Sequence, residues 1–337
     1  MILTFGIVAY NACRYLPSLL SDLKKQDYPH SLIQVILVDS MSTDNTKSIM
    51  LHFADEEKDF KQIVVLDNPN RILAAGWNVL LKHVAGDAIL RIDAHASIPK
   101  DFIKKNVQYL QKGYDICGGK VLSLQIEQGM WQQTLLAAEN SMFGGSFAAF
   151  RRSDKVREVS TLAFAIYRKK VFESVGFYNE KLVRTEDNEM HYRMRTAGYK
   201  FYFNPNIISY RFSRNSLYRL IKQKFLNGYW IGLTMGICPA CFSLFHFVPF
   251  LFIISIIFCT ILYLCGFKVF FIVLILSYLI VAILMALATY LRNRITCRFA
   301  VLLPLIFLLL HISYGIGTLV GLIKMPFWIC YSSQEDE

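Results

Sequence analysis

The sequence has few acidic residues for its length, and several familiar motifs are missing from it. Against 36 lysines and arginines stand 25 aspartates and glutamates, so the formal net charge is +11. We find no zinc-finger spacing and no basic helix away from the apolar C-terminal part, which argues against a nucleic-acid-binding protein. No Gly-x-Gly-x-x-Gly follows the first apolar run, which disfavours a dinucleotide fold. A basic chain with a strongly apolar end is typical of a protein at a membrane surface.

The eight cysteines form no evident metal or redox motif. Only Cys238 and Cys241 have the Cys-x-x-Cys spacing, and neither a second pair nor a thioredoxin-like context accompanies them. Several others stand in apolar runs, where cysteine behaves as a small hydrophobic residue, so we expect reduced, unpaired thiols. The apolar stretch from Met1 to Ala9 is short and has no basic residues before it. We expect a buried strand there and no signal peptide.

Residues 237–330 are almost entirely apolar and form the expected membrane domain. Three stretches in it exceed the about 20 residues that cross a hydrocarbon core. They are Ser243–Cys265, Phe270–Leu291 and Ala300–Ile323. A buried helical core is the alternative, but soluble helices need a polar face, and three successive stretches lack one. We therefore predict about three transmembrane spans in a multi-pass protein of the inner or plasma membrane.

The charges between these stretches indicate their orientation. The connection at residues 292–298 holds three arginines, whereas the connection at residues 266–268 holds one lysine. The positive-inside rule places the arginine-rich connection in the cytoplasm, together with the basic segment before the first span. Three spans then leave the acidic tail, residues 331–337, outside. A re-entrant piece or a fourth span at residues 231–249 would change the side of the tail.

The region of residues 214–236 links the two parts of the chain. Between Leu217 and Trp230, basic residues mix with leucine, isoleucine and aromatic residues. This pattern is typical of an amphipathic helix lying in the membrane interface, and an ordinary surface helix is the alternative. Its place directly before the apolar stretches favours the interface.

Residues 1–213 alternate short apolar runs with amphipathic stretches. We expect strands at residues 3–9, 34–38, 63–66 and 88–92, and helices at residues 16–25, 44–53 and 74–83. This alternation predicts an α/β fold with a mostly parallel sheet and helices on both faces. In such sheets ligands bind beyond the carboxyl ends of the strands. Asp39 and Asp93 stand at two such ends.

A candidate metal site follows the fourth expected strand. Asp93 and His95 are separated by one residue, so both side chains can reach one cation. A carboxylate suits Mg²⁺ or Mn²⁺, and the imidazole favours Mn²⁺. A capping aspartate with a surface histidine is the alternative.

Two further polar clusters are candidates for binding and catalysis. The loop after Asp39 can bind a nucleoside through that carboxylate and phosphate through backbone N–H groups, or it is a plain strand–helix turn. Glu186, Asp187 and Glu189 open a helical stretch. One of these carboxylates can act as a general base with a raised pKa, or all three complement the helix dipole.

Taken together, these motifs resemble the family 2 glycosyltransferases of the GT-A fold. Members typically carry Tyr-Asn after the first strand, an Asp-Ser-x-Ser-x-Asp loop, a metal motif of the Asp-x-Asp type and a late Thr-Glu-Asp. This chain has all four in order, over about residues 3–230. A narrower similarity to the succinoglycan-type exopolysaccharide glycosyltransferases rests on Asn70-Arg71, Gly76, Asn78, Arg91, Gly118-Gly119, Phe143-Gly144-Gly145, Glu189, Arg193, Lys222-Gln223 and Gly228.

The resemblance implies an inverting transfer in a single displacement and assigns a role to individual residues. The nucleotide-sugar donor, with UDP as the default nucleotide, is expected to bind at Tyr10, Asn11, Asp39, Arg71, Gly76 and Asp93. Asp93 and His95 are expected to hold Mn²⁺ or Mg²⁺ on the diphosphate as a Lewis acid. Asp187 is the expected catalytic base. Weaker expected contacts to acceptor or phosphate are Glu186, Arg193, Gln223 and Trp230.

The acceptor follows from the membrane part of the chain. A lipid-linked sugar lies at the interface, and tethering both partners to one surface raises their effective concentration. We expect one sugar to be added to a polyprenyl-diphosphate-linked saccharide in surface or exopolysaccharide biosynthesis. Processive members carry Gln-x-x-Arg-Trp, which this chain lacks. A polyprenyl-phosphate sugar synthase and a non-catalytic membrane scaffold are the alternatives, and the sequence predicts no oligomeric state.

Overall fold

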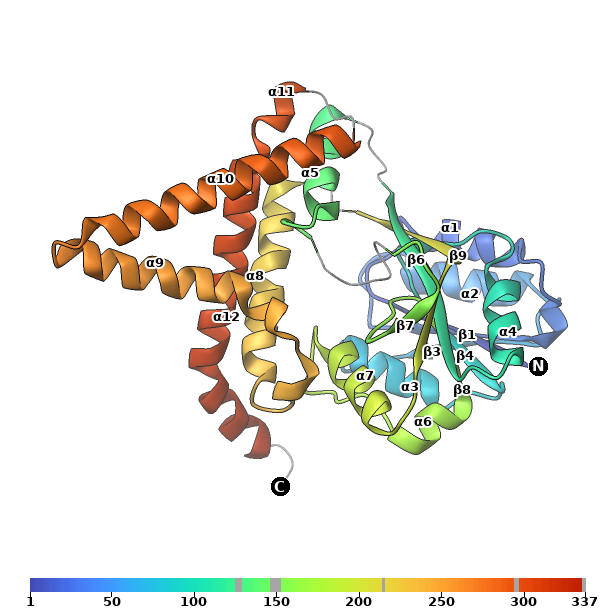
Figure 1. Ribbon diagram of the computed structural model, residues 1–337. Coiled ribbons are helices and arrows are strands. Elements are labelled where there is room, and N and C mark those ends of the chain that lie inside the picture. Colours follow the sequence, from blue (N-terminus) through green and yellow to red (C-terminus); the bar gives the residue numbers. More distant parts are fainter. Residues whose placement is uncertain (125–128, 146–152, 214–215, 294–296, 335–337) are drawn as a thin grey trace. The chain divides into compact units, whose positions relative to one another are not determined.

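The computed structural model describes residues 1–124, 129–145, 153–213, 216–293 and 297–334, and it divides into two compact units (Figure 1). The α/β unit comprises residues 1–124 and 148–212. The helical unit comprises residues 125–147 and 213–337. The described residues 129–145 thus group with the C-terminal helices, which differs from the continuous domain of residues 1–213 that we expected.

The first half of the α/β unit follows the expected strand–helix alternation, with each end within about three residues. Its elements are β1 (Leu3–Ala9), α1 (Leu16–Lys24), β2 (Ile33–Asp39), α2 (Thr46–Glu56), β3 (Gln62–Asp67), α3 (Leu73–Leu81) and β4 (Ala88–Asp93). β1 and β2 are buried along their whole length, as is typical of central parallel strands. β1 pairs in parallel with β2 and β4, and β2 with β3.

The second half makes the sheet mixed. Its elements are β5 (Ala96–Ser97), α4 (Phe102–Gln111), β6 (Ile116–Leu124), β7 (Arg157–Val159), β8 (Ala165–Arg168), α6 (Lys169–Val175), α7 (Glu186–Thr196) and β9 (Phe201–Phe212). The strand order is β3-β2-β1-β4-β8-β6-β9-β5, with β7 on β9. β8 runs antiparallel to both β4 and β6. The expected parallel arrangement therefore describes β1 to β4 and also the pairing of β6 with β9, whereas β5, β7 and β8 add antiparallel pairs.

Apolar residues cover both faces of this sheet. Alternate residues of β1, such as Phe5 and Ile7, pack with α1, α2 and α4 in one core. Val8 packs with α3, α6 and α7 in a second core that contains Trp77 and Tyr167. Helices on both faces, as the sequence predicts, leave the carboxyl ends of β1, β2 and β4 as the edge where polar side chains gather.

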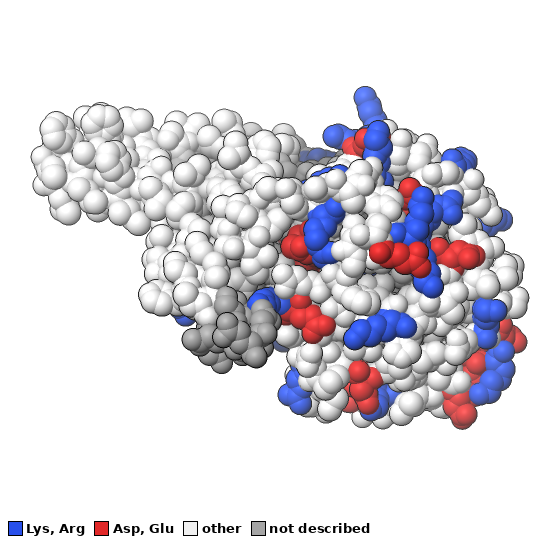
Figure 2. Space-filling view, turned by 90° about the horizontal axis from the view of Figure 1, so that it is seen from below, with Lys and Arg blue, Asp and Glu red and all other residues white. Residues whose placement is uncertain are grey.

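The helical unit contains long apolar helices. Its elements are α5 (Met130–Asn140), α8 (Leu217–Thr234), two short 3₁₀ turns (Pro239–Cys241 and Leu244–Phe247), α9 (Val248–Leu264), α10 (Lys268–Asn293), α11 (Cys297–Ala300) and α12 (Leu303–Gln334). By length and composition, Leu244–Leu264, Lys268–Asn293 and Leu303–Cys330 are candidate membrane spans, within a few residues of the expected stretches except at the far end of the third. On the face drawn in Figure 2, charged side chains gather on the α/β unit and few lie on the helical unit.

Residues 129–145 join the helical unit through the Phe-Gly-Gly sequence at its end. The ring of Phe143 meets that of Phe307 edge-on, with centroids 5.4 Å apart. Its carbonyl oxygen accepts a hydrogen bond from Nε2 of His311 at 2.5 Å. A Cβ at Gly144 would lie 3.1 Å from the Phe307 ring, so glycine permits this close approach. Of the acidic tail, residues 335–337 lie outside the described residues, as does Arg294.

Candidate active site

The parallel register brings the expected donor residues to one edge. β1 lies between β2 and β4, and Ala9 pairs with Asp39 while Val8 pairs with Asp93. The two aspartates therefore flank the end of β1. Tyr10, which is 54% exposed, follows directly after that end. A nucleotide approaching this edge would meet all three.

Asp39 is 1% exposed, and its two carboxylate oxygens have different surroundings. Oδ2 accepts a hydrogen bond from the Ser42 backbone N–H at 3.0 Å. Oδ1 is buried and has no hydrogen-bond partner among the described residues, and the same holds for the Oδ1 atom of Asn68. Asn68 also donates to Ser40 Oγ at 3.0 Å, directly beside Asp39. Buried acceptors without donors are uncommon in native proteins and suit a ligand with N–H or O–H groups.

The loops that frame this position have unusual backbone conformations. Asn11 has φ 47° and Arg71 has φ 59°, in the left-handed region that asparagine tolerates better than arginine does. The Oδ1 atom of Asn11 accepts from the Thr43 N–H at 2.8 Å, which ties the end of β1 to the loop after β2. Arg71 is exposed in the turn before α3.

Gly76 packs against β1, the central strand of the site. It lies in α3, where a Cβ would overlap the Val8 side chain and lie 3.1 Å from Nδ2 of Asn68. The structure therefore gives Gly76 a packing role at the β1–α3 contact. A direct contact between Gly76 and the donor stays a prediction.

Asp93 and His95 lie together at the end of β4. The Nε2 atom of His95 is 3.9 Å from Oδ2 of Asp93, and both side chains are partly exposed. Among the described residues no group of three or more His, Cys, Asp or Glu side chains forms a complete metal site. A carboxylate and an imidazole fit a cation that takes its remaining ligands from substrate phosphates and water, as Mg²⁺ and Mn²⁺ commonly do.

Arg91 links this strand to the acidic start of α7. It is 4% exposed and forms an ion pair with Oδ1 of Asp187, while its second terminal nitrogen lies 3.6 Å from Oε1 of Glu186. It also donates to the Tyr178 hydroxyl at 3.0 Å, and its guanidinium lies 4.9 Å from the centre of the Trp77 ring. A buried arginine needs such partners. Because Arg91 lies two residues before Asp93, it joins the expected base to the strand that carries the expected metal ligands.

The charges in this cluster are strongly coupled. Burial lowers the pKa of Arg91, but Asp187, Tyr178 and Glu186 outweigh burial and hold that pKa well above its ordinary value. Burial, together with the charge of Asp187, raises the pKa of Glu186 to about 8. Oε2 of Glu186 is buried and has no hydrogen-bond partner among the described residues. At neutral pH Glu186 therefore holds a proton, while Asp187 is the carboxylate that contacts Arg91 most closely.

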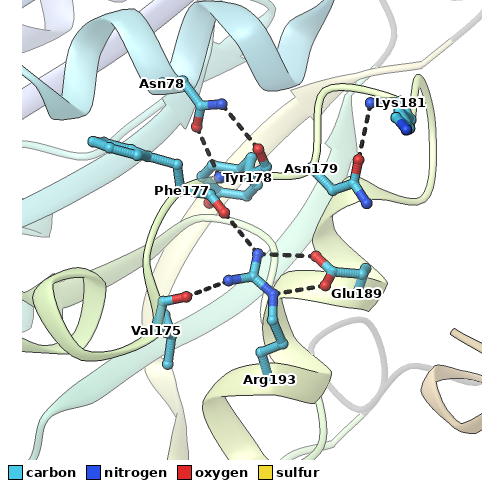
Figure 3. Close-up of polar contacts among 8 residues, drawn as sticks. All are labelled: Asn78, Val175, Phe177, Tyr178, Asn179, Lys181, Glu189 and Arg193. Carbon is cyan, nitrogen blue, oxygen red and sulfur yellow. Dashed lines mark hydrogen bonds and ion pairs between the residues drawn. The ribbon is translucent and has the colours of Figure 1, made fainter. Parts of the chain in front are cut away.

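As Figure 3 shows, the loop that carries Tyr178 is held by Asn78 of α3 and by Arg193 of α7. Asn78 accepts from the Tyr178 N–H at 2.8 Å and donates to the Tyr178 carbonyl at 2.9 Å. Arg193 donates to both carboxylate oxygens of Glu189, at 2.6 and 3.0 Å, and to the carbonyls of Val175 and Phe177. These contacts give Arg193 a structural role, and its contact with acceptor or phosphate stays a prediction.

Two expected residues belong to the other unit. Gln223 and Trp230 lie in α8, where the Trp230 ring meets Trp328 edge-on at 6.1 Å. Sequence reasoning missed Trp77, Tyr178 and Asn68. Arg91 was a usable signal, because an arginine inside an apolar strand predicts buried acceptors elsewhere in the chain.

Comparisons with known proteins identify the family and the fold of the chain. Residues 4–176 match the model of the family described as glycosyl transferase family 2. The chain is 24% identical to a dolichyl N-acetylglucosaminyl phosphate diacetamido-dideoxy-glucuronosyltransferase of Methanococcus voltae, over 94% of this chain and 96% of the relative. It is 28% identical to the succinoglycan biosynthesis protein ExoA of Rhizobium meliloti, over 67% of each chain. The mannosyltransferase PcManGT of Pyrobaculum calidifontis, solved with GDP-Man and Mn²⁺, superposes with a TM-score of 0.60 at 14% identity, covering 94% of this chain and 86% of that one.

Proposed function

The chain belongs to glycosyl transferase family 2, and from this we propose that it moves one sugar from a UDP-sugar to a polyprenyl-diphosphate-linked saccharide during surface or exopolysaccharide biosynthesis. The Methanococcus relative is named for a transfer to a dolichyl-phosphate-linked sugar, and the Rhizobium relative for the biosynthesis of an exopolysaccharide. The candidate membrane spans suit an acceptor held in a bilayer.

One observation supports this proposal most strongly. A base candidate, Asp187, is joined through Arg91 to the strand that carries Asp93 and His95, and Asp39 ends a strand at the same edge. In the proposed reaction Asp39 binds the nucleoside, and its unpartnered Oδ1 accepts a ligand N–H or O–H. Asp93 and His95 would hold Mn²⁺ or Mg²⁺, which supplies Lewis-acid stabilisation of the diphosphate leaving group.

Asp187 accepts the proton of the acceptor hydroxyl in this scheme. Arg91 contacts Oδ1 of Asp187, so Oδ2 is the oxygen that we assign to the acceptor. The side chain of Asp187 is 35% exposed, whereas that of Glu186 is 5% exposed and protonated at neutral pH. The greater exposure of Asp187, together with the proton held by Glu186, favours Asp187 as the base.

The orientation is also part of the proposal. Nucleotide sugars are made in the cytoplasm, and the basic residues at 292–298 favour the cytoplasmic side for that connection. We therefore place the α/β unit in the cytoplasm, at the inner or plasma membrane.

The test is Asp187→Asn in the full-length protein. We expect transfer to fall by about 10²–10⁴-fold, the usual contribution of a general base, while nucleotide-sugar binding is retained. The transfer rate is measured with Mn²⁺, a panel of UDP-sugars and prenyl-diphosphate saccharides as acceptors. Nucleotide-sugar binding is measured by calorimetry. Asp55→Asn, a change of an exposed carboxylate on α2, is the matched control.

Other outcomes would favour a different base, a different acceptor or a non-catalytic role. Full transfer by Asp187→Asn would remove the base role. If that variant instead glycosylated a prenyl phosphate well, a polyprenyl-phosphate sugar synthase would be favoured, because an ionised phosphate needs no base. Purified protein that binds nucleotide sugars with no turnover on any acceptor would support a scaffold.

A further inference from the structure

α8 and α12 pack side by side and run in the same direction. Their contacts advance together along both helices, and several of them join residues whose numbers differ by 92 or 93. These pairs are Ile221 with Ser313, Phe225 with Gly317 and Tyr229 with Gly321, followed just beyond the end of α8 by Gly236 with Ile329. Because the pairing covers almost the whole of α8, the two helices form one element, which we call the α8–α12 pair.

Glycines make the α8–α12 pair unusually close. A Cβ at Gly228 would overlap the Tyr314 carbonyl oxygen, and a Cβ at Gly232 would lie 2.6 Å from the Leu322 nitrogen. Gly317 and Gly321 of α12 approach the α8 backbone in the same way. Small residues four apart let helix backbones meet directly. Because their backbones are in contact and parallel, α8 and α12 must lie at the same angle to a membrane.

α9 and α10 form a different kind of element. Figure 1 shows their hairpin running across the direction of the α8–α12 pair. Only 6% and 11% of the residues in their apolar windows are buried, against 39% in the window of α12. The 26 residues of α10 extend about 39 Å, more than the about 30 Å of a hydrocarbon core. A hairpin that contacts α12 only in part and leaves most of its apolar side chains exposed is suited to lipid.

The charges on α8 oppose a membrane crossing by α12. The apolar stretch Leu303–Cys330 has its middle near Ile316. An offset of 92 places Lys224 of α8 beside that middle, with the exposed Lys222 next to it. Crossing by α12 would therefore carry α8 lysines to the centre of the bilayer, where charged side chains are strongly unfavourable.

The α8–α12 pair has instead the composition of an interfacial element. Arg219, Lys222 and Lys324 are exposed, and Trp230 packs against Trp328. Basic residues are attracted by anionic headgroups, and tryptophan is enriched at the level of the headgroups.

We propose that only α9 and α10 cross the membrane, and that the α8–α12 pair lies in the anionic headgroup layer on the side where α8 begins. The C-terminus then lies on that same side, in contrast to the three spans that hydropathy predicts. A four-helix crossing that included α8 would place the arginines of residues 292–298 outside, against the positive-inside rule.

Two native cysteines test this topology in the full chain. Cys265 lies at the turn between α9 and α10, Cys330 lies near the end of α12, and both are exposed. Right-side-out spheroplasts are treated with a membrane-impermeant maleimide before and after permeabilisation. We expect Cys265 to be labelled at once and Cys330 only after permeabilisation. Cys265→Ser and Cys330→Ser assign the two signals.

Each other result is decisive as well. Labelling of Cys330 before permeabilisation would overturn the proposal in favour of three spans, and protection of Cys265 would overturn the α9–α10 crossing. If lipid shields Cys330 in both conditions, C-terminal fusions of the full chain decide. A fluorescent GFP fusion supports the proposal, and an active alkaline phosphatase fusion overturns it.

Discussion

The buried carboxyl of Glu186 predicts a measurable dependence of stability on pH. Its pKa is raised from 4.5 to about 8, chiefly by burial and then by the charge of Asp187. A carboxyl with a raised pKa binds its proton more tightly in the folded state than in the unfolded state. Its contribution to stability is therefore complete below about pH 4.5 and is lost as the pH rises toward about 8.

The perturbation is Glu186→Gln, which replaces the protonated carboxyl by a neutral side chain of the same shape. One pH unit corresponds to about 1.4 kcal/mol for a group that is protonated only in the folded state. Between pH 5 and pH 7.5 the wild type should lose about 3 kcal/mol of unfolding free energy relative to the variant. For a domain of this size that is about 6–12 °C in Tm.

The assay compares the Tm of the two full-length proteins in detergent across this pH range. Titrations common to both proteins cancel in the difference. Glu173→Gln, a change of an exposed residue on α6, is the matched control and should show no such trend. A Glu186→Gln difference that stays constant from pH 5 to pH 7.5 would show that Glu186 is not protonated in the fold. A difference of opposite sign would show that Arg91 holds it ionised.

Two further predictions concern the metal and Arg193. Removing divalent cations with a chelator should stop transfer, and Mn²⁺ should restore it; His95→Asp should shift the preference from Mn²⁺ toward Mg²⁺, because an all-oxygen site suits Mg²⁺ better. Initial rates with each metal measure this, and undiminished transfer in chelator would exclude a metal role. Arg193→Lys should cost about 1–3 kcal/mol, measured by unfolding, since lysine cannot make the paired bonds to Glu189 and the two carbonyls. An increase in acceptor KM with unchanged stability would instead support the acceptor contact.

Sequence reasoning predicted the part of the fold in which strands and helices alternate, although it did not predict that β4 pairs with β1 and not with β3. β1 to β4 alternate with α1 to α3 along the chain, and this alternation predicts parallel strands that are connected through the helices. β6, β8 and β9 escaped prediction because their order in the sheet depends on pairing between strands far apart in the sequence, antiparallel at β8 and parallel between β6 and β9. Residues 129–145 escaped it because their partners, such as Phe307, lie more than a hundred residues further along the chain.

The amino-acid sequence by itself determined the chemistry available and the presence of apolar helices. Strand ends at Asp39 and Asp93, the late Glu186-Asp187 pair and the long uncharged stretches can all be recognised from residue type and spacing. Only the tertiary structure decided which carboxylate carries the proton, because that depends on the burial of Glu186 beside Arg91. It also separated the apolar helices into two kinds, because whether α12 can cross a bilayer depends on the charges of the helix packed against it.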